Sequence, residues 1–271
     1  MIEHKKLSRE LYSEICSLLD IDPNTDRKTV EFLDSKLDIG SVEQAYKKLT
    51  QLLSHRIAFI FGAGPSLPTA LIEVQPILKK FKDKITVIAV DGATKALQEQ
   101  DISIDIIVSD LDGGVDSIKN ELERETVIVI HAHGDNQNKI EQFFKRLDNT
   151  MDIIGTSQSF ETGKIKNLGG FTDGDRAVYL AANFNTKLVV LFAFDFGNKV
   201  GRYSKPDIFT EDVITSERKK IKLDFAKKLL AILIADFPKC KILNCTPQGE
   251  EIPNVQKITF SHLEEILKEQ Y

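Results

Sequence analysis

From residue 57 onward, short runs of β-branched and aliphatic residues alternate with stretches of helical periodicity, and this alternation limits the folds open to the chain. The runs are IAFIF, ITVIAV, DIIVSD, TVIVIHAH, MDIIGTS, KLVVLFAFDF and CKILNC. Strands that are nearly continuous in apolar residues are typical of a sheet covered on both faces. The order therefore predicts an α/β fold: a mostly parallel, doubly wound, Rossmann-like sheet with helices on both faces.

The first 54 residues have a different pattern. LSRELYSEICSLLD, DRKTVEFLDSKL and SVEQAYKKLTQLLSH show helical spacing without a convincing strand. They predict a small helical subdomain over residues 1–54, followed by an α/β domain over 55–250. A closing segment over 251–271 is expected to carry a helix capped by Thr259 or Ser261.

Charge and hydropathy exclude several classes of protein. The formal net charge is −5, which argues against general nucleic-acid binding through a basic surface. The longest apolar runs, such as residues 188–194, are far shorter than the roughly 18 to 20 residues that span a bilayer, and the N-terminus lacks the apolar core of a secretory signal. We expect a cytoplasmic protein with no nucleic-acid or membrane partner, and its assembly into a homo-oligomer is left open.

Polar residues follow six of the predicted strands at the point where each strand ends. In an open parallel sheet, ligands bind outside the carboxyl ends of the strands, so these residues are expected to share one edge. In strand order they are Gly62, Gly64, Pro65 and Ser66; Asp91 and Gly92; Ser109, Asp110 and Asp112; His131, His133 and Asp135; Gly155, Thr156 and Ser157; and Asp195.

The segment SDLDGG is the sharpest local signal at this edge. Asp110 and Asp112 have no basic neighbour in sequence, and two such carboxylates repel each other unless a cation compensates them. In an extended chain both would point the same way, and Gly113 and Gly114 would let the chain turn away. Because Mg²⁺ prefers carboxylates, water and substrate phosphates, the pair predicts a magnesium site; the alternative is a solvated acidic turn.

Two glycine-containing segments precede predicted helices and are possible phosphate sites. In FGAGPSLP, Gly62 and Gly64 would let the backbone approach a phosphate at a helix N-terminus; the alternative is a tight turn with Ser66 as the N-cap. In NLGGFTDGDRA, Thr172 or Asp173 can cap the helix, and Arg176 can reach an anion held there.

The loop GNKVGRYSKP and the basic helix that follows it carry a cluster of cations. Lys199 and Arg202 in the loop, with Lys219 and Lys222 on the helix, would close over a polyphosphate as a mobile lid. The alternative is an ordinary solvated face, which is the expectation for Lys227 and Lys228.

The segment HAHGDN ends the fourth strand. HxH can bind zinc, but no HExxH motif or cysteine ligand accompanies it, so zinc is the weaker assignment. Asp135 is the better functional candidate, and the alternative is that it only caps the next helix.

Taken together in this order, FGAGPSL, VDGATKAL, IDIIVSDLDGG, HAHGDN and NLGGFTDGDRAVYLA resemble the archaeal 6-hydroxymethyl-7,8-dihydropterin diphosphokinase family, and more distantly thiamin diphosphokinases. A similar domain occurs in bacterial flagellin-glycosylation accessory proteins. The resemblance implies magnesium-dependent transfer of diphosphate from ATP to the pterin hydroxymethyl group, with release of AMP, in the biosynthesis of folate or methanopterin-type cofactors.

The resemblance also suggests roles for the residues at the sheet edge. Asp110 and Asp112 would hold Mg²⁺, and Asp91 or Asp135 would complete the site or orient the hydroxyl. The predicted nucleotide and phosphate contacts are Gly62, Gly64, Pro65, Ser66, Thr172, Asp173, Arg176, Lys199, Arg202 and Lys222. Two other readings stay open: a non-catalytic nucleotide-binding module, and a sugar-nucleotide glycosyltransferase in which a DxD-type pair holds the metal.

Overall fold

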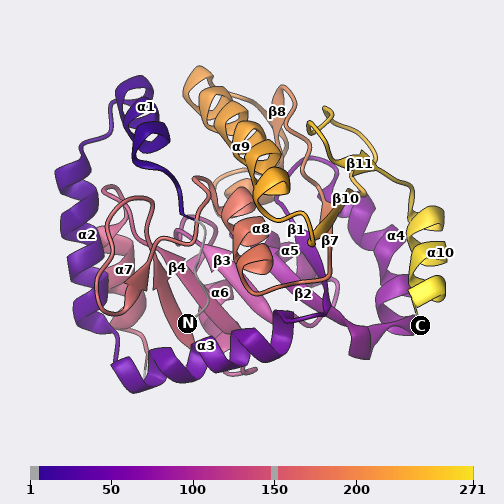
Figure 1. Ribbon diagram of the computed structural model, residues 1–271, viewed down its shortest axis with the longest axis horizontal. Helices are drawn as coiled ribbons and strands as arrows, with labels where there is room; N and C mark the ends of the chain where they lie inside the picture. The colour runs from indigo at the N-terminus through magenta and orange to yellow at the C-terminus, as the bar shows by residue number, and fades with distance from the viewer. Residues whose placement is uncertain (1–5, 148–151, 271) are drawn as a thin grey trace.

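A computed structural model describes residues 6–147 and 152–270 of the chain (Figure 1). Its described part contains a nine-stranded sheet in the order β11-β10-β7-β1-β2-β3-β4-β5-β6, and every neighbouring pair is parallel. The strands are β1 Ile57–Phe61, β2 Ile85–Val90, β3 Ile106–Ser109, β4 Val127–His131, β5 Ile153–Thr156, β6 Ile165–Lys166, β7 Leu188–Phe192, β10 Lys241–Asn244 and β11 Gln256–Lys257. The predicted α/β fold with a mostly parallel sheet is confirmed.

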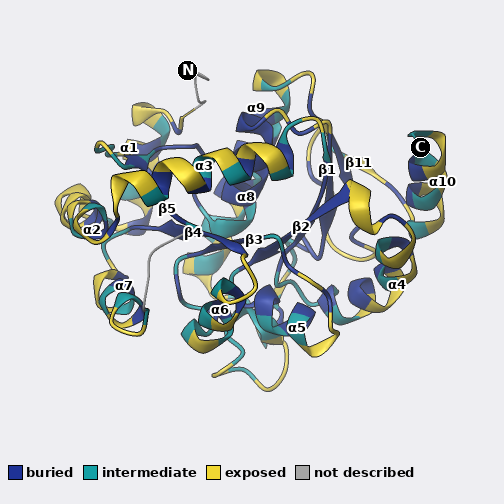
Figure 2. Cartoon of the chain, turned by 90° about the horizontal axis from the view of Figure 1, so that it is seen from below, coloured by how far each residue is buried: buried dark blue, intermediate teal, exposed yellow. Residues whose placement is uncertain are grey.

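Helices cover both faces of this sheet, as Figure 2 shows: α3 and α8 lie on one face, and α5 and α6 lie on the other. The central strands β1, β2, β4 and β7 are buried along their whole length, which explains why their sequences are apolar without alternation. The helices after β1 are α4 Leu67–Lys80, α5 Ala93–Glu99, α6 Val115–Leu122, α7 Gln137–Phe144, α8 Asp173–Asn183, α9 Glu217–Asp236 and α10 Phe260–Gln270.

Three helices precede the sheet: α1 Arg9–Leu19, α2 Pro23–Lys36 and α3 Ile39–Leu53. Each begins after a residue whose side chain accepts a backbone N–H of the first turn, namely Ser8, Asp22 and Asp38. Their apolar faces belong to the same hydrophobic cluster as the sheet. The helices are thus where the pattern predicted them, and the division of the chain at residues 54 and 250 stays a prediction.

Several short elements were not predicted. β6 and β11 have two residues each, as do β8 Lys199–Val200 and β9 Val213–Ile214, which form an antiparallel pair. Two residues are too few to show a periodicity. Of the two caps predicted for α10, Thr259 is the one that accepts a backbone hydrogen bond, from His262 at 3.2 Å.

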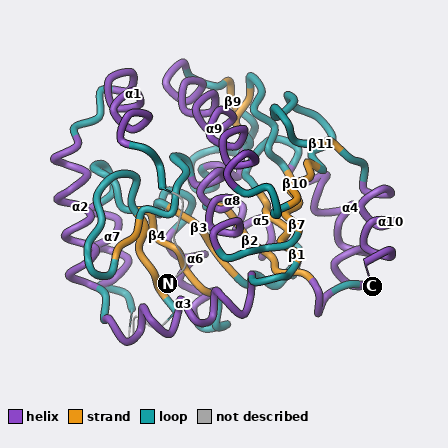
Figure 3. The backbone as a smooth tube through the Cα atoms, viewed as in Figure 1, coloured by secondary structure: helices purple, strands orange, loops and turns teal. Residues whose placement is uncertain are grey.

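The loops that follow the parallel strands gather at one edge of the sheet, where α1 and α9 stand over them (Figure 3). This arrangement places residues from many loops around one space. Across residues 6–147 and 152–270, no helix combines the length and the apolarity needed to cross a membrane.

Candidate functional site

A cavity of about 390 Å³ lies along the carboxyl edge of the sheet. Loops after β1, β2, β3, β4, β5 and β7 line it, together with the start of α8, one side of α9, and the α1–α2 junction. Of the residues predicted as catalytic, metal or nucleotide contacts, those that line it are Gly62, Gly64, Pro65, Asp91, Asp110, Asp135, Thr172, Asp173, Lys199 and Lys222. His131, His133 and Asp195, predicted at the same edge, and Lys219 of the cation cluster line it as well.

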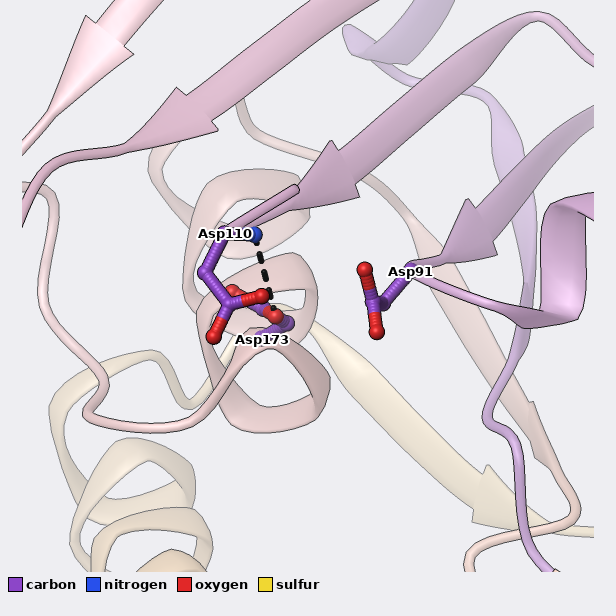
Figure 4. A group of neighbouring side chains, drawn as sticks. All are labelled: Asp91, Asp110 and Asp173. Carbon is purple, nitrogen blue, oxygen red and sulfur yellow. Dashed lines mark hydrogen bonds between the residues drawn. The ribbon is translucent and has the colours of Figure 1, made fainter. Parts of the chain in front are cut away.

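Three carboxylates meet on the floor of this cavity. Asp91 follows β2, Asp110 follows β3, and Asp173 is the first residue of α8 (Figure 4). One oxygen of each lies within 4.8 Å of one oxygen of the other two. We call Asp91, Asp110 and Asp173 the acidic triad.

The triad concentrates like charge at half-buried positions. Burial raises the pKa of Asp91 to about 7, and the charge of Asp110 adds to this effect. Burial also raises the pKa of Asp173 well above its usual value, and the charges of Asp110 and Asp91 act in the same direction. Burial would raise the pKa of Asp110 too, but His133, Lys139 and Lys219 outweigh it and lower the pKa. Ionising the whole triad is therefore costly without a cation.

The oxygens of the triad suit a magnesium ion. All three groups are hard oxygen donors, the ligand type that Mg²⁺ prefers. Oδ1 of Asp173 is buried and has no hydrogen-bond partner among the described residues, so an acceptor is left available. A divalent cation would offset the like-charge repulsion and would give this oxygen a partner.

Backbone conformation explains why Asp112 is outside the triad. The prediction assumed an extended chain through SDLDGG, but Leu111 adopts a left-handed conformation with φ 68° and breaks it. Asp112 forms ion pairs with Lys139 and, at 3.5 Å, with Lys205. Asp112 is not among the described residues that line the cavity, and Asp173 stands where the sequence suggested Asp112.

Asp91 is held by the same turn. It too is left-handed, with φ 48°. Its Oδ1 accepts hydrogen bonds from the hydroxyl of Ser109 at 2.6 Å and from the backbone N–H of Gly113 at 2.9 Å. The loop after β3 therefore positions both Asp91 and Asp110.

The glycine turn after β1 lines the cavity, but packing alone accounts for its glycines. A Cβ on Gly62 would lie 2.8 Å from the carbonyl oxygen of Ala193, and one on Gly64 would lie 2.0 Å from Oδ2 of Asp195. Asp195 also accepts from the N–H of Ser66 at 3.3 Å and from its hydroxyl at 2.9 Å. Ser66 makes no side-chain cap, and phosphate binding at this turn stays a prediction.

The loop after β4 places a histidine next to the triad. Nε2 of His133 lies 3.4 Å from Oδ2 of Asp110. Asn136 is the N-cap residue of α7, so the alternative that Asp135 caps this helix is wrong. The amide of Asn136 instead donates to the carbonyl oxygens of Asp110, at 2.9 Å, and His131, at 2.6 Å. Asp135 is exposed at the cavity rim.

At the start of α8, capping and cavity lining are carried out by different residues. Thr172 is the N-cap and forms a capping box with Asp175, which leaves Asp173 free to face the cavity. Arg176 is only 3% exposed and is not among the cavity-lining residues. Its Nη1 donates to the carbonyl oxygen of Ser157 at 3.2 Å. Burial lowers the pKa of Arg176 to about 10, although nearby aspartates, Asp175 first among them, oppose the shift.

Cations face the triad from α9 and β8. Lys199, Arg218, Lys219 and Lys222 line the cavity, and burial, together with the charge of Lys219, lowers the pKa of Lys222. The predicted contact Arg202 is exposed instead, with its guanidinium carbon 5.0 Å from the centre of the Tyr203 ring. Two parts of the lining were not predicted from the sequence: Arg218, and the cavity wall at the α1–α2 junction, formed by Asp20, Ile21, Asp22, Thr25 and Asp26.

A model of the family described as 6-hydroxymethylpterin diphosphokinase MptE-like matches residues 36–201. The chain belongs to this family. The acidic triad and Lys199 lie inside the matched range, whereas α9 and the wall at the α1–α2 junction lie outside it.

Curated relatives agree with the MptE-like assignment. Two are named 6-hydroxymethyl-7,8-dihydropterin pyrophosphokinase. The one from Methanothermobacter thermautotrophicus is 39% identical over 81% of this chain and 90% of its own length, and the one from Methanocaldococcus jannaschii is 36% identical over 82% and 92%. A solved Maf glycosyltransferase from Magnetospirillum magneticum AMB-1 matches with a TM-score of 0.49 at 16% identity, covering 85% of this chain and 40% of that one.

Proposed function

We propose that this protein transfers the terminal diphosphate of ATP to the hydroxymethyl group of 6-hydroxymethyl-7,8-dihydropterin, with Mg²⁺, and releases AMP. The acceptor follows from the family and from the names of the relatives. The observation that carries the chemistry is the half-buried acidic triad, which lines the same cavity as the cations Lys199, Arg218, Lys219 and Lys222.

The residues present match what this transfer requires. Diphosphoryl transfer depends mainly on positioning the reactants and on stabilising phosphate charge, with little covalent help from the protein. Asp91, Asp110 and Asp173 would hold Mg²⁺, which neutralises charge on the phosphate oxygens when bound. Lys199, Lys219 and Lys222 would contact the phosphates from the opposite side. The rigid loop after β3 keeps two carboxylates in place before substrate arrives.

The direct test is to incubate the protein with ATP, Mg²⁺ and the dihydropterin and to identify the nucleotide product. AMP is expected, in equal amount to the diphosphorylated pterin. ADP would indicate an ordinary kinase, and no consumption of ATP would indicate a binding module. Release of a nucleoside diphosphate from a sugar nucleotide in a parallel incubation would instead favour a glycosyltransferase.

Asp110→Asn is the matched variant for this assay, with Asp116→Asn as its control. Asp116 is exposed on α6 and pairs with Arg146, away from the triad. We expect loss of AMP formation by about 100-fold or more only in Asp110→Asn, because several kcal/mol of charge stabilisation is removed.

A further inference from the structure

The cavity has two chemically different ends on either side of the acidic triad. The strand order β7-β1-β2-β3-β4-β5 places Asp91 and Asp110, after β2 and β3, in its middle. We call the end lined by His131, Gly134 and Gln158, with Asp26 and Ile21, the β4–β5 end. The β1–β7 end is lined by Gly62, Gly64, Phe194, Asp195 and Lys199.

We propose that the β4–β5 end binds the pterin ring of the acceptor and that the nucleotide occupies the β1–β7 end. The proposal rests on the proposed function, since it assigns the two substrates of that reaction. A transfer between two reactants places them on opposite sides of the group that moves, so the diphosphate over the triad separates the two ends.

The β4–β5 end is a built hydrogen-bonding site. Asp26 is 2% exposed, and its Oδ1 accepts the N–H of Gly134 at 2.6 Å while its Oδ2 accepts the hydroxyl of Tyr12 at 2.7 Å. The side-chain amide of Gln158, itself 3% exposed, also donates to Oδ2 of Asp26. These bonds fix two side chains that line the cavity, and a carboxylate has about four acceptor positions, so one remains for a ligand.

One buried group at this end lacks a partner. Nδ1 of His131 has no hydrogen-bond partner among the described residues, and the His131 side chain is 3% exposed and lines the cavity. A buried polar atom normally finds a partner in protein, water or ligand. An incoming ring with donors and acceptors along one edge would satisfy it.

Charge decides which reactant belongs here. Asp20, Asp22, Asp26 and Asp135 all line the cavity on this side, where they outnumber the cations beside them, Arg218 at Leu19 and Lys222 near Asp135, so their charges disfavour a polyphosphate tail. Arg218 is tied to the carbonyl oxygen of Leu19 at 2.5 Å, so its guanidinium holds the α1 end in place. A neutral heterocycle with an amide and an amino group presents N–H donors, which match these acceptors.

Apolar side chains complete the site for a flat ring. Ile21, Phe171 and Leu223 line the cavity between the polar groups. Binding sites for small heterocycles combine such surfaces with a few fixed polar groups. At the other end, the glycine turn, Lys199 and Phe194 are left for the nucleotide.

The test is calorimetric binding of 6-hydroxymethyl-7,8-dihydropterin, with and without Mg²⁺ and an uncleavable ATP analogue. Gln158→Leu removes the amide at similar size and should weaken pterin binding by about 10-fold or more. Gln98→Leu is the matched control, because its amide likewise donates to a carboxylate, that of Glu121, and also to the carbonyl oxygen of Ser117, but lies outside the cavity lining. Lys199→Ala should weaken binding of the ATP analogue and leave pterin binding unchanged.

Thermal unfolding of each variant shows whether it is folded. Thr25→Val is a second variant at the same end of the cavity; Thr25 is exposed, so this change leaves the buried hydrogen bonds of Asp26 intact. Unchanged pterin affinity in folded Gln158→Leu, with AMP formation intact in the wild type, would overturn the assignment of this end and leave the proposed function standing. Loss of pterin binding in Lys199→Ala would place the ring at the opposite end. A wild-type protein that neither binds the pterin nor forms AMP would overturn both proposals.

Discussion

The backbone N–H of Asp110 donates to Oδ2 of Asp173 at 3.2 Å, and this bond joins the end of β3 to the first turn of α8. The two residues are 63 positions apart in the sequence. The bond holds one Asp173 oxygen and leaves the other unpartnered within the triad. The site therefore depends on how the sheet and α8 pack together.

Exchanging Asp173 for Asn should impair catalysis more than the same change at Asp112. Asp173→Asn removes a triad oxygen and is expected to lower kcat by about 100-fold or more, whereas Asp112→Asn removes only ion pairs with Lys139 and Lys205. The measurement is AMP formation across a magnesium titration. A larger loss of AMP formation in Asp112→Asn than in Asp173→Asn would instead support Asp110 and Asp112 as the pair of magnesium ligands.

Stability of the metal-free protein should depend on pH through Asp91. Its folded pKa of about 7 lies above the usual value of 3.8, so the folded state binds more protons than the unfolded state between these values. The free energy of unfolding should therefore fall as pH rises from about 4 to about 7, on the order of 1 kcal/mol per pH unit. Urea unfolding in EDTA at several pH values measures the slope.

Asp91→Asn provides the control for this titration. The variant should show a shallower slope, with the remainder carried by Asp173, and be more stable than wild type at pH 8, because the buried charge of Asp91 and its repulsion with Asp110 are gone. Added Mg²⁺ should raise the stability of the wild type at pH 8 and have little effect on Asp91→Asn. A slope of the opposite sign would contradict the raised pKa.

Lys222 is expected to contribute to nucleotide affinity. It lines the cavity and feels the charge of Asp110, whereas Lys220 on the same helix is exposed and does not line it. Lys222→Met should raise KM for ATP by about 10-fold, the effect of losing one charge-assisted hydrogen bond, and Lys220→Met should leave it near wild type. Initial rates at varied ATP concentrations compare them, and equal KM values would refute the role of Lys222.

Gly64 should tolerate no side chain. A Cβ there would lie 2.0 Å from Oδ2 of Asp195 and 2.5 Å from the carbonyl oxygen of Ala193. Gly64→Ala should lower the free energy of unfolding by about 1–3 kcal/mol, as overpacking does. Gly163→Ala is the control, because a Cβ at Gly163 meets nothing within 4 Å, and its effect should stay within about 0.5 kcal/mol. Chemical denaturation of both variants checks the difference, and equal stabilities would show that Asp195 moves aside freely.

The sheet could be predicted from the sequence because strands buried on both faces consist almost entirely of apolar residues. Strands such as IAFIF and ITVIAV are apolar throughout, and the polar residues after them fall at the carboxyl edge as the parallel order requires. The same rule placed Asp91 and Asp110 together correctly in the loops after β2 and β3.

The sequence could not supply the third carboxylate. Assigning Asp112 assumed an extended chain, and nothing in SDLDGG shows that Leu111 is left-handed. Asp173 was assigned to capping or phosphate binding, because a local pattern does not tell which of Thr172, Asp173 and Asp175 closes the capping box. The wall at the α1–α2 junction could not be predicted from a local pattern either, because long-range packing sets its contact with the sheet edge.

That wall has a consequence for how such an enzyme diversifies. Residues 20–26 contribute to the cavity through a helical pair that supplies none of the triad, so the segment beside the proposed acceptor site and the strand ends that carry Asp91 and Asp110 are encoded separately. With the pterin at the β4–β5 end as proposed, substitutions in this pair would change which alcohol is accepted while the strand ends stay constant. A chimera carrying the first 35 residues of a homologue with another acceptor preference would inherit that preference together with unaltered transfer chemistry.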